Sequence, residues 1–277
     1  MTYNFICDVL RDAGVENYSF DAELLLERFC GVSRERLIFS KDIDFNSSEL
    51  ERAVELRKNR YPLQYILGEW TFCGDTYVVG EGCLIPRQET ELTVLTAARL
   101  LPEKAKFIDL GTGSGCITVS LLKRRPDCTA VAVDISDDAL GFARKNAENN
   151  GVSERITFIK ADMLDDRAPD VIIPDGIVDA VISNPPYIRS DVVKTLAPEL
   201  SFEPKSALDG GCDGLDFYRA VIKNFSRKLT DDGLFIFEIG FDQGGDLEKL
   251  AEQSGFDCKI EKDLAALDRT VILRRKK

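Results

Sequence analysis

The segment Ser183–Ile188, SNPPYI, places an amide, two prolines and an aromatic ring directly after an apolar run. Proline cannot donate to a sheet ladder and pushes the residue before it toward extended geometry, so the Pro-Pro pair ends a strand abruptly. Asn184 and Tyr187 are therefore expected in a stiff turn at a strand end. Amide and carbonyl oxygens accept N–H hydrogens, and an aromatic ring stacks on planar groups. The chemistry that these residues favour is the orientation of a planar nitrogen group.

An amide or exocyclic amine nitrogen is a poor nucleophile because its lone pair is delocalised. If the Asn184 side-chain oxygen and the Pro185 carbonyl each accept one of its hydrogens, the lone pair is aimed and the developing positive charge is stabilised. Pro186 and Tyr187 would complete this substrate site. Such orientation can lower a barrier by about 7–11 kcal/mol, so no strong general base is required. The chain contains no histidine, which excludes a Ser-His or Cys-His nucleophile.

A second motif, IDLGTGSG, lies upstream between an apolar run and a segment with helical character. The dinucleotide fingerprint G-x-G-x-x-G would need a glycine at position 116, which is Cys116. An acid followed by G-x-G-x-G is instead typical of S-adenosyl-L-methionine (SAM) sites. SAM carries no phosphate but has an ammonium and a sulfonium, which suit a nearby carboxylate. The alternative is a tight strand-to-helix turn without a ligand. The loop residues that we expect to contact SAM are Asp109, Gly111, Thr112, Gly113 and Gly115.

Two further acids follow predicted strands. Asp134 ends the strand AVAVD, where a carboxylate can accept both hydroxyls of a ribose. Its alternative role is a helix N-cap, but Ser136 already suits that role. Asp162 could accept the adenine amino group, with Met163 near the ring, although an Asp at a strand end is also common in turns. Asn184 would lie beside the same cofactor.

The elements that must position these residues alternate from Lys106 onward between apolar strands and amphipathic helices. This alternation predicts an α/β domain with a parallel sheet and helices on both faces, in which ligands bind at the carboxyl ends of the strands. We expect this domain over residues 89–277, a β-hairpin linker over 71–88 and a small helical domain over 1–70. In the helical part, Ser48 and Glu51 have capping-box spacing.

Composition narrows the function further. The net charge is −12, and no basic stripe is visible, so we expect no binding to duplex nucleic acid. No run approaches the roughly 18 apolar residues of a membrane span, and the first residues do not form a secretion signal. The eight cysteines include no C-x-x-C pair, which disfavours a zinc site and fits reduced thiols in a cytoplasmic protein.

Taken together, PLQYILGEWTFCGDTYVV, LIPRQETE, SNPPYI, FEPKSALDGGCDGLDFYR and LFIFEIG resemble the peptide chain release factor N(5)-glutamine methyltransferase family (PrmC/HemK). The resemblance spans nearly the whole chain. It implies a helical N-terminal domain, a hairpin linker and a class I (Rossmann-like) seven-stranded methyltransferase domain. It also implies SAM as methyl donor, S-adenosyl-L-homocysteine as product, and the glutamine of the Gly-Gly-Gln loop of class 1 release factors as substrate. The implied roles are a cofactor loop at Gly111, Gly113 and Gly115, a ribose acid at Asp134, and an amide clamp at Asn184 and Pro185 beside Tyr187.

The sequence departs from the family at Gln88, where proline is more frequent, and at residues 164–177, which are longer and more apolar and have no functional explanation. Arg87 could hold the linker or contact substrate, or it could cap a helix. Phe202-Glu203-Pro204 could line a substrate channel or pack as an ordinary loop. The functional alternatives are an adenine N(6)-methyltransferase, which shares NPPY, and a protein that binds SAM without catalysis.

Overall fold

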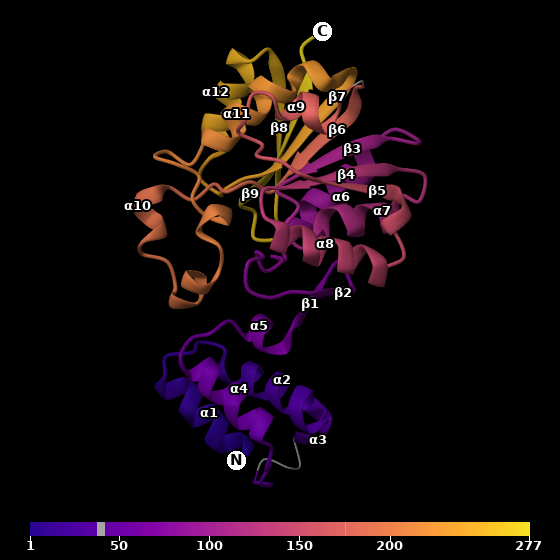
Figure 1. Cartoon of the computed structure of the whole chain (residues 1–277). Helices are drawn as coiled ribbons and strands as arrows, with labels where there is room; N and C mark the ends of the chain where they lie inside the picture. The colour runs from indigo at the N-terminus through magenta and orange to yellow at the C-terminus, as the bar shows by residue number, and fades with distance from the viewer. Residues whose placement is uncertain (38–41, 175) are drawn as a thin grey trace. The chain divides into compact units, whose positions relative to one another are not determined.

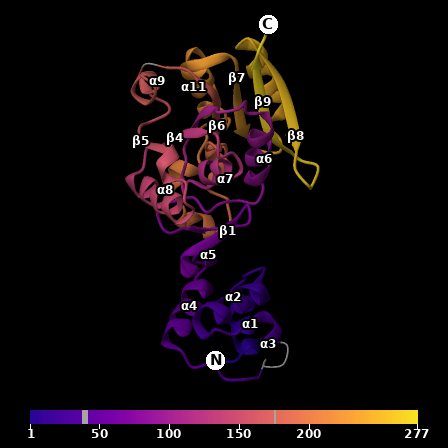
Figure 2. The ribbon, with the colours of Figure 1, turned by 90° about the vertical axis from the view of Figure 1, so that its right-hand side faces the viewer.

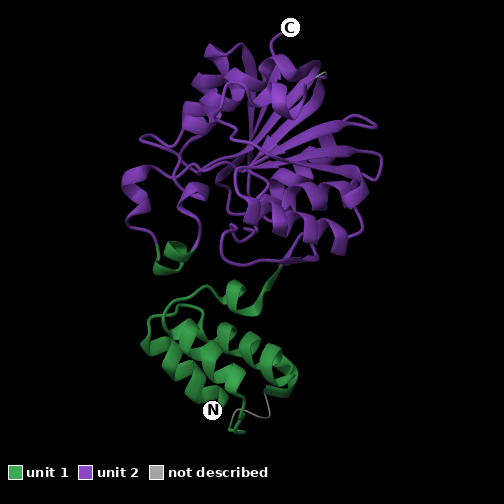
Figure 3. Ribbon diagram, viewed as in Figure 1, with its two compact units in different colours: residues 1–70, 197–202 green, residues 71–196, 203–277 purple. Residues whose placement is uncertain are grey.

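The structure, a computed structural model, describes residues 1–37, 42–174 and 176–277. It divides into two compact units (Figure 3). A helical unit contains residues 1–70 and 197–202, and an α/β unit contains residues 71–196 and 203–277. Within the described residues, no helix has the length and apolarity that crossing a membrane would require.

The helical unit packs its helices around an apolar core that includes Leu10, Leu25 and Leu50, which are fully buried. Its helices are α1 (Tyr3–Asp12), α2 (Tyr18–Cys30), α3 (Arg34–Leu37), α4 (Ser48–Lys58), α5 (Leu63–Leu67) and the 3-10 turn η2 (Pro198–Phe202). The predicted capping position was wrong by one residue, because the Oγ of Ser47, not that of Ser48, accepts a hydrogen bond from the Leu50 N–H.

Buried charges tie the separate chain segments of the helical unit together. Arg57 donates from Nε to Asp21 at 2.6 Å and from Nη1 to Glu199 at 3.0 Å. Arg60 also donates from Nε to Glu199, at 2.6 Å. The segment 197–202 therefore belongs to this unit by its contacts, although it lies between two strands of the α/β unit in the sequence.

The α/β unit is built on a seven-stranded sheet in the order β5-β4-β3-β6-β7-β9-β8 (Figure 1). Its strands are β3 (Lys106–Leu110), β4 (Thr129–Asp134), β5 (Ile156–Lys160), β6 (Val178–Ser183), β7 (Leu229–Glu238), β8 (Phe256–Lys262) and β9 (Asp268–Arg275). The predicted parallel sheet is confirmed for β5, β4, β3, β6 and β7, and the last strand, β9, runs antiparallel to both β7 and β8. The β8–β9 connection is a short hairpin, which only antiparallel strands allow.

Helices cover both faces of this sheet, as Figure 2 shows from the side. Successive strand residues point to opposite faces, so Phe107 packs in one apolar core and Ile108 in the other. The helices on the Phe107 side are α6 (Thr90–Leu100), α7 (Cys116–Arg124) and α8 (Asp137–Asn149). Those on the Ile108 side are α9 (Ala168–Ile172), α11 (Asp216–Phe225) and α12 (Gly244–Gln253).

Shorter elements complete the chain. They are α10 (Ser190–Val193) and the 3-10 turns η1 (Ser153–Arg155), η3 (Lys205–Ala207) and η4 (Ser226–Lys228). The unexplained stretch 164–177 contains α9, whose Ile172 is buried in the core, and residue 175 lies outside the described residues.

The expected hairpin is present but short. Strands β1 (Glu69–Phe72) and β2 (Asp75–Val78) form a two-stranded sheet, and both residues of the turn, Cys73 and Gly74, have positive φ. Two positive φ angles are the mark of the type I′ turn that fits strand twist. Residues 79–88 continue without strand structure.

Candidate active site

The glycine loop follows β3 and leads into α7. Gly111, Gly113 and Gly115 all have positive φ, which L side chains rarely adopt. A Cβ on Gly115 would lie 3.1 Å from backbone and side-chain atoms of Ala143, so this glycine permits close packing against α8. A Cβ on Gly113 would meet no atom within 4 Å among the described residues, and Gly113 lines a cavity. The loop therefore presents bare backbone to an open space.

Asp109 and Thr112 lie behind this loop. The Asp109 carboxylate is fully buried, and its Oδ2 accepts hydrogen bonds of 2.7 Å from the hydroxyls of Thr112 and Thr118. Its Oδ1 accepts none from the described residues. Burial raises the pKa of Asp109 to about 6. Asp109 and Thr112 therefore stabilise the glycine loop from its buried side. Direct contact of either residue with a cofactor remains a prediction.

Asp134 ends β4 and faces the cavity. Its Oδ2 accepts the N–H of Gly113 at 2.9 Å, and its Oδ1 accepts the N–H of Ser136 at 3.0 Å. Ser136, not Asp134, caps α8, because its Oγ accepts the N–H of Ala139. Burial raises the pKa of Asp134. Each carboxylate oxygen has two lone pairs and uses one for a backbone N–H, so both oxygens retain capacity to accept a ligand hydroxyl.

Asp162 and Met163 follow β5 and line the same cavity. Asp162 Oδ1 accepts the N–H of Leu164 at 2.9 Å, which is the turn geometry that was the alternative to a binding role. The Met163 methyl group lies 3.0 Å from the position that a Cβ on Gly111 would take, so the two residues face each other closely.

The SNPPY segment follows β6 as predicted. Asn184 is half-buried and lines the cavity, and its Nδ2 donates to Oγ1 of Thr90 at 3.1 Å. Its Oδ1 accepts no hydrogen bond within the described part of the chain. Tyr187 instead lies against the apolar core, where its hydroxyl donates to Oε1 of Glu238 at 3.2 Å. Burial raises the pKa of Tyr187 well above its ordinary value.

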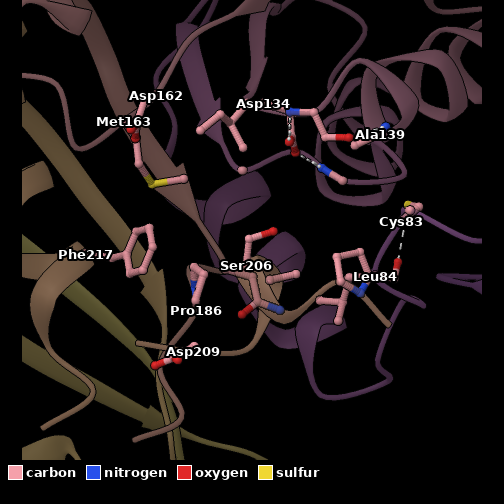
Figure 4. A pocket seen from close by; sticks show the side chains of 18 of the residues that line it. Cys83, Leu84, Asp134, Ala139, Asp162, Met163, Pro186, Ser206, Asp209 and Phe217 are labelled. Carbon is pink, nitrogen blue, oxygen red and sulfur yellow. Dashed lines mark hydrogen bonds between the residues drawn. The ribbon is translucent and has the colours of Figure 1, made fainter. Parts of the chain in front are cut away.

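These elements enclose a cavity of about 360 Å³ (Figure 4), within the size range of small-ligand sites. The predicted residues that line it are Gly111, Gly113, Asp134, Asp162, Met163, Asn184 and Pro186. The predicted residues outside the lining are Asp109, Thr112, Gly115, Pro185 and Tyr187.

Sequence reasoning missed part of the wall. Phe217, Ser206, Asp209 and Leu84 also line the cavity, and Figure 4 shows Ser206 beside Leu84. They come from α11, from the segment after NPPY and from the chain after the hairpin, and none follows a strand end. The signal that marked the other residues, a polar side chain at the end of an apolar run, is absent from these positions.

Arg87 and Glu203 form an ion pair, while substrate contact by either residue remains a prediction. Arg87 Nη2 donates to Oε1 of Glu203 at 2.5 Å, and the N–H of Ile85 donates to Oε2 at 3.0 Å. Glu203 is only 6% exposed. Arg87 therefore holds residues 85–87 against the chain that follows NPPY. The neighbouring residues Leu84 and Pro204 line the cavity.

Comparison with known proteins fits these observations. Residues 101–241 match the model of a methyltransferase domain, and residues 3–68 match that of the PrmC N-terminal domain. The release factor glutamine methyltransferase of Geobacter sulfurreducens is 38% identical over 95% of this chain and 91% of its own length. The protein of the same name from Caulobacter vibrioides is 36% identical over 96% and 92%. The chain belongs to the release factor glutamine methyltransferase family. The solved ribosomal protein L11 methylase of Lactobacillus delbrueckii subsp. bulgaricus shares the fold, with a TM-score of 0.51 and 22% identity over 72% of this chain and 84% of that one.

As a member of this family, the protein is a methyltransferase that uses SAM. The cavity suits such a group in its donor set. The glycine loop offers backbone without side chains, Asp134 keeps acceptor capacity for a ribose, and Asp162 and Met163 border the same space. Which of these residues contact the cofactor remains a prediction.

Proposed function

We propose that this methyltransferase transfers a methyl group to the side-chain N(5) of the glutamine in the Gly-Gly-Gln loop of class 1 peptide chain release factors. The observation that carries the proposal is the orientation of Asn184. Its amide nitrogen is engaged by Thr90, which leaves the oxygen as the atom available in the cavity. An oxygen there can accept an N–H from a substrate amide, and the relatives bear the name of this activity.

In this proposal Asn184 Oδ1 and the Pro185 carbonyl each accept one hydrogen of the glutamine amide. SAM, when bound, supplies an electrophilic methyl group on its sulfonium. The clamp turns the nitrogen lone pair toward the cofactor side of the cavity and stabilises the positive charge that develops on nitrogen. The methylated nitrogen then carries one proton too many and releases it to water, because a protonated amide is a strong acid.

We also propose that residues 1–70 recognise the body of the release factor and residues 71–88 link them to a methyltransferase domain of residues 89–277. The model of the PrmC N-terminal domain covers residues 3–68, and the buried Arg57 of this region is paired with Asp21. If the helical part grips the body, an intact release factor should be a better substrate than a peptide of its loop alone. The proposed place of action is the cytoplasm, where translation terminates.

The experiment incubates the full chain with methyl-labelled SAM and an unmethylated class 1 release factor, and with adenine-containing DNA in parallel. Mass spectrometry locates the label. A release factor with alanine in place of the Gly-Gly-Gln glutamine is the matched control, because only the methyl acceptor changes. Label on that glutamine, lost in the control, supports the proposal. Label on adenine alone would replace it with the adenine N(6) activity.

A further inference from the structure

Behind Asn184 lies a buried polar group that the proposed mechanism does not use. Strands β6 and β7 are parallel, and Ser183 is in register with Phe237. The next residues along these strands are Asn184 and Glu238, so both stand at the carboxyl end of the sheet. Thr90, the first residue of α6, joins them from a third element.

Two separate contacts involve the clamp residue Asn184 and the carboxylate of Glu238. Asn184 Nδ2 donates to Thr90 Oγ1, and Tyr187 donates to Oε1 of Glu238. Thr90 and Glu238 are 2% and 1% exposed. Glu238 Oε2 is buried and accepts no hydrogen bond from the described residues. A buried acceptor in this state is costly, and it favours any neighbouring hydroxyl that points a proton toward it.

We propose that Thr90 and Glu238 are positioning residues that fix which end of the Asn184 amide faces the cavity. The inference rests on the proposed function, because it assumes that Asn184 must offer an acceptor to the substrate. An asparagine amide can present either its oxygen or its NH2 group to a given neighbour after a half-turn. Only the orientation with the oxygen in the cavity can bind a substrate N–H.

The argument follows the single proton of the Thr90 hydroxyl. An ionised carboxylate only accepts hydrogen bonds, so it draws that proton toward itself. Thr90 Oγ1 can then only accept from Asn184, which requires Nδ2 on the Thr90 side and Oδ1 in the cavity. Tyr187 occupies Oε1, so Oε2, which has no partner among the described residues, is the acceptor that the proposal assigns to the Thr90 hydroxyl.

Protonation of Glu238 would remove the preference of the Thr90 hydroxyl proton for the carboxylate. A neutral carboxylic acid can donate to Thr90 Oγ1, and the threonine proton would then be free to point at Asn184 and favour the reversed amide. Burial raises the pKa of Glu238 to about 7, against the lowering effects of Thr90, Arg269 and Tyr187. The titratable groups that act on Glu238 or respond to its charge are Glu89, Arg269, Tyr187, Tyr218 and Cys116.

The kinetic test measures kcat and KM with an unmethylated release factor and SAM. We expect Glu238→Gln and Thr90→Val to lower kcat about tenfold or more, with KM for SAM unchanged. Thr90→Ser keeps the hydroxyl, so most of the wild-type kcat should remain in this variant. The matched control is Thr93→Val, which removes a buried hydroxyl one turn further along α6 that bonds Thr270 rather than the clamp.

The pH profile gives a readout that mere loss of stability would not change. Because the ionised carboxylate is the orienting form, wild-type kcat should be full above the pKa of Glu238, about 7, and fall as the pH drops below it. In Glu238→Gln this step should disappear, leaving a low kcat at both ends of the range.

A second readout needs no methyl acceptor. The side-chain NH2 resonances of Asn184, assigned by comparison with Asn184→Asp, should titrate near the pKa of Glu238 in the wild type and stop titrating in Glu238→Gln. If the wild type labels no release factor, the proposed function is wrong and this titration alone decides the positioning role. Wild-type kcat in both Glu238→Gln and Thr90→Val, or an unchanged titration in Glu238→Gln, would overturn the inference.

Discussion

Two sets of buried charges, one in each unit, are handled in opposite ways. In the helical unit, the Arg57 and Asp21 side chains are 9% and 6% exposed and form an ion pair, and Glu199 joins it. In the α/β unit, the carboxylates of Asp109 and Glu238 are buried without an ion pair among the described residues, and each has one oxygen that accepts no hydrogen bond.

The difference separates structural from functional charge. Paired buried charges fix an arrangement, and removing one partner is far more costly than never having had the pair. Burial raises the pKa of Asp21, Asp109 and Glu238 alike, but only Asp109 and Glu238 lack an ion pair among the described residues. Groups with perturbed pKa values cluster at functional sites. Asp109 lies near the carboxyl end of β3, behind the glycine loop that borders the cavity. Glu238 is the last residue of β7, close to Asn184 of the clamp. Four substitutions test whether this distinction holds, in order of expected effect.

The largest effect is expected for Arg57→Met, which leaves Asp21 and Glu199 without their shared partner. Breaking a buried pair costs about 3–5 kcal/mol, so the free energy of unfolding should fall by this amount in denaturant titration. Lys58→Met is the control, because Lys58 pairs with Glu55 at the surface and such pairs contribute about 0–1 kcal/mol. Equal losses in the two variants would remove the structural half of the comparison.

Next in size is Asn184→Ala, which removes the acceptor in the cavity. Loss of one such group costs about 10²–10³ in kcat, or about 2.7–4 kcal/mol. SAM should bind as before, as measured by calorimetry, because the clamp acts on the substrate. Asn149→Ala removes an exposed amide at the end of α8 and should change neither quantity. Wild-type turnover of Asn184→Ala would contradict the clamp.

The part of this site that the sequence predicts is the part that follows from the geometry of a parallel sheet. Carboxyl ends of parallel strands meet at one edge, so residues that end predicted strands, such as Asp134 and Asn184, could be placed together from alternation alone. Glycine spacing predicted the loop for a similar reason, since positive φ leaves a mark in composition.

The rest depends on contacts between distant segments, which periodicity does not encode. Thr90 and Glu238 lie 148 positions apart and matter only because α6 packs against β7, the strand that pairs with β6. Likewise, nothing local marks residues 197–202 as part of the helical unit, because Glu199 is assigned there by two arginines far earlier in the chain. The burial of Asp109 is also a tertiary effect, since the same carboxylate at an exposed strand end would face the ligand.

The third prediction concerns Asp109 and pH. Its folded pKa of about 6 is raised above the unfolded value, so the folded state binds the proton more tightly. This contribution to stability is full below the unfolded pKa of about 3.9 and is lost as the pH rises through about 6. Asp109→Asn lacks it, so its stability relative to the wild type should rise by about 2 kcal/mol between about pH 4 and pH 8. Denaturant titrations at the two pH values give the difference in the free energy of unfolding between Asp109→Asn and the wild type. If this difference is the same at both, the Asp109 carboxylate is not kept unpaired in solution.

The smallest effect is expected for Asp134→Asn, and it asks whether a half-satisfied carboxylate marks a ligand. Both oxygens of Asp134 already accept one backbone N–H, and asparagine keeps one of them as an acceptor. The NH2 group that replaces the other oxygen cannot accept an N–H, so one loop hydrogen bond, one ribose acceptor and the charge are lost. The Kd for SAM should rise about tenfold, or about 1.4 kcal/mol. Asp137→Asn is the control, because the Asp137 carboxylate at the start of α8 is 75% exposed and pairs with Lys160 at the surface. If both variants bind SAM equally, the free lone pairs of Asp134 do not bind the cofactor. An acceptor with spare capacity beside the cavity would then no longer be a sign of function that separates the α/β unit from the helical unit.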